Sequence, residues 1–135
     1  MRKIIVYLSL ILAFSCSLND DAQDYHFEIL PVESVIIPNE FVLGEVYEIT
    51  LTYIRPSNCH AFNDIYYARE LNERTVAIIA IVFTNNGNCE EIEDELEATL
   101  SFKPTNNGSY VFKFWQGEDG NGEDQYLIVE VPVID

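Results

Sequence analysis

The sequence predicts an all-β fold, an antiparallel sandwich of about seven strands. Beyond residue 24, apolar and polar residues alternate at every second position over much of the chain, as in strands with one buried face. Asn-Gly pairs, which favour tight turns, lie between these segments. No stretch after the N-terminal leader has helical periodicity, and 135 residues indicate a single domain. The Asn-Gly pairs are Asn86-Gly87, Asn107-Gly108 and Asn121-Gly122.

The N-terminal segment has the features of a secretion signal. Arg2 and Lys3 precede an apolar run, residues 4–14. Eleven helical residues rise about 16 Å, roughly half of a ~30 Å hydrocarbon core, so the run is too short for a permanent transmembrane helix. We expect residues 1–15 to be cleaved on export. An acidic tether, residues 16–24, then leads into a folded domain, residues 25–135.

The end of this leader, Ala13-Phe14-Ser15-Cys16, resembles the lipobox of bacterial lipoproteins, in which small residues precede a cysteine that becomes the mature N-terminus. The resemblance implies an acylated Cys16 thiol and a lipid anchor. Residues 17–21 resemble the acidic stretch that some Gram-negative lipoproteins use to reach the cell surface. The resemblance therefore implies an outer-membrane or cell-surface location. The alternative is ordinary cleavage after Ser15 or Ser17, which releases a secreted protein.

Cys59 and Cys89 remain once Cys16 is assigned to the lipid. An even pair of cysteines in an oxidising compartment predicts one disulfide. The alternative is a catalytic thiol, because His60 directly follows Cys59. Adjacent residues of an extended chain point to opposite faces, so this pair is poorly placed for catalysis, and the disulfide is favoured.

Seven segments are strand candidates. Residues 27–37 contain Pro31, which cannot donate to a ladder, so they predict an edge strand. Residues 76–83 are continuously apolar and predict a central strand covered on both sides. Residues 65–71 precede them. The other four segments alternate, with apolar positions Tyr47, Ile49, Leu51 and Tyr53; Leu96, Ala98, Leu100 and Phe102; Tyr110, Phe112 and Phe114; and Leu127, Val129, Val131 and Val133.

Residues 102–112, with Pro104, Gly108 and Tyr110, resemble the corner before the sixth strand of many bacterial immunoglobulin-like domains. In that family the corner turns the chain from one sheet to the other, and the tyrosine hydroxyl returns to the backbone. The resemblance implies an immunoglobulin-like sandwich. It also implies that the loops holding Cys59 and Cys89 lie at one end, together with the loop between the last two strands.

Acidic residues dominate the charge. The chain has 7 Lys+Arg and 23 Asp+Glu, for a formal net charge of −16, which argues against nucleic acid and against anionic lipid as partners. Ten of the 23 acids lie in residues 90–97 and 118–124. Oxygen-rich loops suit Ca²⁺, but the spacing matches no EF-hand. We therefore favour a solvated acidic surface without metal or cofactor, and a calcium site in these segments is the alternative.

Aromatic residues suggest a binding surface. Trp115 ends a strand whose alternate positions are apolar, so its side chain is expected to point outward. With Tyr66 or Tyr67 it would form a platform for a sugar or a peptide. The alternative is that Trp115 packs under a loop or against a sheet edge.

These observations predict a non-enzymatic binding or structural module at the bacterial envelope, with an unknown protein or glycan as partner. A first alternative rests on weak similarity to small immunoglobulin-like inhibitors of cysteine peptidases. Their Asn-Pro-Thr-Thr-Gly-Tyr motif is missing, and residues 55–60 occupy its place. A second alternative, a small hydrolase-like enzyme, would need a pocket that joins His60, Asp64 and an acidic loop residue. His26 lies near the tether and has no evident triad role.

Overall fold

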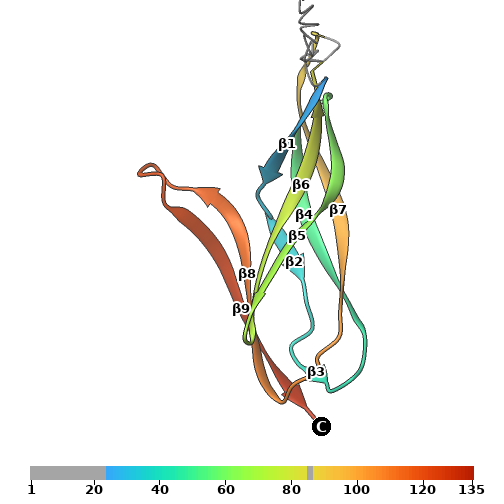
Figure 1. Ribbon diagram of the computed structural model, residues 1–135, viewed down its shortest axis with the longest axis vertical. Coiled ribbons are helices and arrows are strands. Elements are labelled where there is room, and N and C mark those ends of the chain that lie inside the picture. Colours follow the sequence, from blue (N-terminus) through green and yellow to red (C-terminus); the bar gives the residue numbers. More distant parts are fainter. Residues whose placement is uncertain (1–23, 85–86) are drawn as a thin grey trace, which may run out of the picture.

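The computed structural model describes residues 24–84 and 87–135. They form nine strands in two sheets, without a helix, so the predicted all-β sandwich is confirmed (Figure 1). The expected secretion signal (residues 1–15), Cys16 and the expected tether up to residue 23 lie outside these ranges, as does Asn86. The strands are β1 (Tyr25–Leu30), β2 (Ser34–Ile36), β3 (Phe41–Val42), β4 (Tyr47–Ser57), β5 (His60–Glu70), β6 (Glu73–Phe83), β7 (Glu91–Phe102), β8 (Gly108–Glu118) and β9 (Asp124–Ile134).

The larger sheet is built around β6. In this sheet the order is β1-β6-β8-β9-β3, and β5 pairs with the other edge of β6. β1 and β8 share one edge of β6, because β1 pairs with residues 78–83 and β8 pairs with residues 73–76. The smaller sheet has the order β2-β4-β7. Most pairings are antiparallel, as the sequence predicts, whereas the pairings β6–β8 and β3–β9 are parallel.

The alternating segments bury most of the positions that the sequence predicts, although Leu96 is exposed. Ile49 and Leu51 of β4 and Phe112 and Phe114 of β8 are fully buried, and they pack with the inner face of β6. β6 is a central strand with partners on both edges, as predicted, but the expectation that both its faces are covered is wrong, because Ile79 and Ile81 on its outer face are partly exposed. The positive φ angles of Gly108 (+103°) and Gly122 (+76°) permit the turns expected there.

Two features raise the strand number from seven to nine. The segment 27–37 breaks at Pro31 into β1 and β2, which belong to different sheets. The residues between them are bonded to both sheets, because the Val32 N–H donates to the Trp115 carbonyl (2.8 Å) and the Glu33 N–H to the Thr52 carbonyl (2.7 Å). The second feature is β3, which no sequence pattern indicated.

The corner before β8 has the geometry expected for Tyr110. Its hydroxyl oxygen accepts the N–H groups of Thr105 and Asn106, both at 3.1 Å, and its ring is buried. Burial alone would raise the pKa of Tyr110, but the two amide donors and the Arg74 guanidinium stabilise the phenolate, and the pKa is lowered overall. The corner therefore ties the loop before β8 to the core.

The predicted disulfide joins Cys59, in the turn between β4 and β5, to Cys89, which precedes β7 (Cα–Cα 5.5 Å). The catalytic-thiol alternative is therefore wrong, since neither sulfur is a free thiol. The bridge fits an oxidising compartment outside the cytosol. In the part of the chain that the structure describes, no helix has the length and apolar character needed to span a membrane.

Candidate functional site

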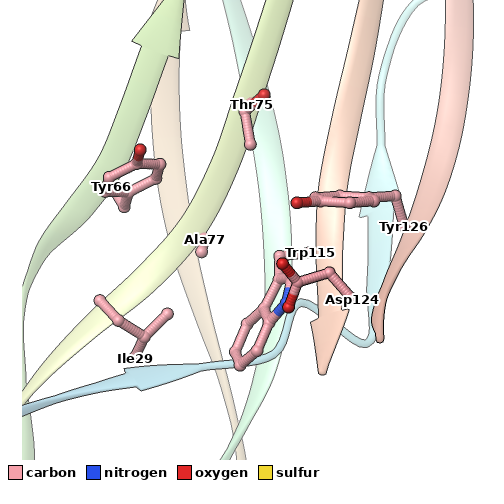
Figure 2. A pocket seen from close by; sticks show the side chains of 7 residues that line it. All are labelled: Ile29, Tyr66, Thr75, Ala77, Trp115, Asp124 and Tyr126. Atoms are coloured by element: carbon pink, nitrogen blue, oxygen red, sulfur yellow. The ribbon is translucent and has the colours of Figure 1, made fainter. Parts of the chain in front are cut away.

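A pocket of about 270 Å³ opens on the outer face of the larger sheet. It lies where the β8–β9 hairpin diverges from β1 and β6, and we call it the aromatic pocket (Figures 1 and 2). Its walls come from β1, β5 and β6 on one side and from β8 and β9 on the other. The lining residues are Ile29, Tyr66, Thr75, Ala77, Trp115, Asp124 and Tyr126.

Strand alternation explains why these side chains meet. Val76 of β6 is fully buried in the core, so its neighbours Thr75 and Ala77 face the opposite side of the sheet. Tyr66 of β5 is the register partner of Ala77 and shares that side. In the same way, Trp115 follows the buried Phe114 and faces outward, as the sequence predicts.

Hydrogen bonds fix the indole of Trp115. Its Nε1–H donates to Asp124 Oδ1 at 3.0 Å, and its backbone carbonyl accepts the Val32 N–H at 2.8 Å. Tyr126 is the register partner of Trp115 across the hairpin, and the Lys113 ammonium lies 4.6 Å from the centroid of its ring. Figure 2 shows the Tyr126 ring reaching from β9 toward β6, with the indole beside it and Tyr66 across the opening.

The structure thus brings Trp115 together with Tyr66. Tyr67 is the register partner of the buried Val76 and lines a different pocket, so it does not contribute to this platform. Sequence reasoning missed Tyr126 and Ile29. Counting outward from the Asn121-Gly122 turn would place Ile128 opposite Trp115, so Tyr126 could not be found in this way. The register shift between Trp115 and Glu118 brings Tyr126 opposite Trp115. Ile29 depends on the pairing of β1 with β6, which no local pattern reveals.

The chemistry of the aromatic pocket suits non-covalent binding. Three aromatic rings offer flat apolar surfaces, and Tyr66 is 44% exposed, so a ligand can stack on it. The Asp124 carboxylate, the tyrosine hydroxyls and the Thr75 hydroxyl are polar groups around the same opening. Apolar walls with a few directional polar groups are typical of small-ligand sites.

The two acidic segments do not form one loop cluster. Residues 91–97 belong to β7 and pair with β4, where the Arg55 guanidinium contacts the Asp94 carboxylate at 2.8 Å. The tip of the β8–β9 hairpin lies well away from β7 in Figure 1. There, Asp119 Oδ1 accepts the N–H groups of Asn121 (2.8 Å) and Glu123 (3.0 Å). Within residues 24–84 and 87–135, no group of three or more His, Cys, Asp or Glu is placed to hold a metal ion. The expectation of two neighbouring acidic loops is therefore wrong.

His60 does not meet Asp64 as the hydrolase alternative requires. Its Nδ1 lies 2.6 Å from Ser57 Oγ, and its Nε2 lies 3.0 Å from Glu28 Oε2. Asp64 instead accepts the N–H of Ile65 at 2.8 Å. Sequence reasoning missed this Ser-His-Glu chain, because Glu28 is 32 residues from His60 in the sequence.

The Ser-His-Glu chain braces β1 against the turn between β4 and β5. Ser57 is 8% exposed, and its Oγ also accepts the Cys59 N–H at 3.2 Å. The linings of the pockets described for this structure contain neither Ser57 nor His60. His26 reaches the same Glu28 carboxylate at 3.6 Å. These contacts therefore hold β1 and the turn between β4 and β5 together beside the disulfide.

Residues 55–60, which occupy the place of the inhibitor motif, are likewise not a free loop. They complete β4, turn at Asn58 and Cys59, and begin β5. Pro56 lies at a bulge, where the β4–β7 register shifts between Arg55 and Ser57.

In comparisons with known proteins, no family model, no curated protein and no solved structure matches the chain.

Proposed function

We propose that this protein is a non-catalytic binding module of the bacterial envelope that takes a saccharide into the aromatic pocket. One observation carries the proposal: the Trp115 indole, fixed by Asp124, faces outward into an opening that it shares with two tyrosine rings. The apolar C–H faces of a sugar ring stack on aromatic rings, and its hydroxyl groups need polar partners. Asp124, Thr75 and the tyrosine hydroxyls line the same opening and can hydrogen-bond to the sugar hydroxyls.

Binding is expected to change the fluorescence of the protein directly, because Trp115 is the single tryptophan of the chain. We expect oligosaccharides of bacterial or host surfaces to shift the emission saturably. Tyr66→Ala should weaken binding about tenfold or more, since buried aromatic contacts dominate binding free energies. Tyr67→Ala is a matched control, because it removes the same side chain from the next residue, on the opposite face of β5.

Two results would contradict the saccharide proposal. One is a Trp115 emission spectrum that none of the tested bacterial or host oligosaccharides changes. The other is equal weakening by Tyr66→Ala and Tyr67→Ala. A response to apolar peptides without any response to sugars would replace the saccharide with a peptide as the ligand.

The location at the envelope rests on the lipobox resemblance of residues 13–16 and on the disulfide, which fits an oxidising compartment. We expect the intact mass of the natively expressed protein to lack residues 1–15 and to include acyl chains. A Cys16→Ser variant should lose the acyl mass. An unacylated wild-type protein that begins after Ser15 or Ser17 would show ordinary secretion instead.

A further inference from the structure

A second pocket, of about 440 Å³, opens between the two sheets. Its residues come from β5 at an edge of the larger sheet, from β6, from β7 at an edge of the smaller sheet, and from the corner that follows β7. We call it the inter-sheet pocket. Tyr67 lines it, whereas the preceding residue Tyr66 lines the aromatic pocket, so the two pockets lie on opposite faces of β5.

The inter-sheet pocket concentrates positive charge in an acidic protein. After residue 24 the chain has only five Lys and Arg residues, and three of them, Arg69, Arg74 and Lys103, line this pocket. Asp64 is the one acidic residue of the lining, and its Oδ1 accepts the Ile65 N–H at 2.8 Å. Among the described residues, the ion pairs do not include any of these three cations.

Arg74 is the buried member of this group, at 6% exposure. Its Nη1 donates to the carbonyls of Leu71 and Glu73, both at 2.8 Å, while its Nε is buried without a partner among the described residues. The guanidinium carbon lies 5.0 Å from the Tyr110 ring centroid and 5.9 Å from that of Phe102. These rings attract the cation but leave its donor capacity incompletely used.

The register adds a second cation directly opposite Arg74. Arg69 of β5 and Arg74 of β6 are Cα partners, and like charges at directly opposite positions destabilise a sheet. A buried cation also costs free energy unless an anion or hydrogen-bond acceptor compensates it. Because the residues that the structure describes supply no carboxylate ion pair here, a bound anion would relieve both costs.

We propose that the inter-sheet pocket binds an oxyanion of a ligand, a phosphate, sulfate or carboxylate group, between Arg69, Arg74 and Lys103. Guanidinium groups match the geometry of oxyanions through paired N–H donors, and an ammonium adds a point charge. The site is separate from the aromatic pocket and does not depend on a saccharide ligand there.

The test is a titration of the disulfide-bonded protein with sodium phosphate, sodium sulfate and sodium acetate, each at constant ionic strength against sodium chloride. We expect saturable shifts of the arginine Nε–Hε signals in ¹H–¹⁵N spectra with at least one of these oxyanions. A response to phosphate and sulfate alone assigns a tetrahedral group, and a response to acetate alone assigns a carboxylate. Absence of any saturable shift beyond that of chloride overturns the proposal.

Matched charge variants separate the pocket from the general field of the protein. Arg69→Gln and Lys103→Gln change exposed residues and are each expected to weaken anion binding about tenfold. Arg55→Gln removes the same charge from β4, where Arg55 pairs with Asp94 outside the pocket, and should leave the affinity unchanged. Equal weakening by Arg55→Gln and Arg69→Gln would overturn the proposal, because the binding would then follow net charge alone.

Discussion

The Cys59→Ala/Cys89→Ala variant is expected to lose roughly 3–4 kcal/mol of unfolding free energy relative to the wild type. The bridge joins residues 30 apart in the sequence, so it removes a large loop-closure entropy from the unfolded chain. Urea denaturation of both proteins under oxidising conditions measures the difference. Reduced wild-type protein is a second measurement of the same loss without any substitution.

Hydrogen bonds beside the disulfide should preserve the native geometry when the bridge is removed. The Asn58 N–H donates to the Glu90 carbonyl at 3.1 Å, and the Glu90 N–H donates to Asn58 Oδ1 at 2.9 Å. These bonds hold the same two segments together in the folded state after the sulfurs are removed, so the native geometry should persist and the loss should come from the unfolded state. A difference below about 1 kcal/mol would contradict the entropic argument.

Phe41→Ala is expected to destabilise the fold by about 3–5 kcal/mol, the usual cost of removing a buried aromatic ring. Phe41 has no exposed surface, and its ring centroid lies 4.9 Å from that of Tyr47 and 5.1 Å from that of Phe102. Phe112 and Tyr110 complete the aromatic cluster at 6.1 and 6.5 Å. Truncation would leave a cavity that these rings cannot close without moving strands of both sheets.

Phe27→Ala is the matched control for Phe41→Ala. Phe27 lies on β1 and is 56% exposed, so its truncation should cost less than about 1 kcal/mol. Thermal or urea unfolding of the two variants under identical conditions makes the comparison. Similar losses of unfolding free energy for both variants would contradict a central place for Phe41 in the core.

Local sequence patterns predicted most of the strands because a strand with one face on the core and the other on solvent alternates apolar and polar residues with a period of two. They failed at β3, since two residues are too few to show a period, even though Phe41 is central to the core. They also failed at residues 91–94, which the sequence predicts in an acidic loop but which belong to β7. Here β4 continues to Ser57 and supplies hydrogen-bond partners to the acidic part of β7.

The candidate binding surfaces were predictable only where the alternation along a single strand fixes the direction of a side chain. Trp115 could be assigned to the outer face because Phe112 and Phe114 fix the inner one. The shared edge of β6, which places Ile29 near Trp115, arises from long-range pairing that no single segment encodes. The opposed pair Arg69 and Arg74 depends on the register of the β5–β6 hairpin in the same way.

The divergence of the β8–β9 hairpin gives the aromatic pocket walls of unequal stiffness. β6 is bonded along both edges, so we expect its amide groups to exchange only on global unfolding. Past Trp115, the residues of the hairpin pair only across the hairpin, between β8 and β9, apart from the side-chain bonds of Gln116 to the Val32 and Glu33 carbonyls. We therefore expect local opening to concentrate at the tip of this hairpin, so that a ligand of the proposed site could displace the Trp115 wall of the pocket more easily than the β6 wall.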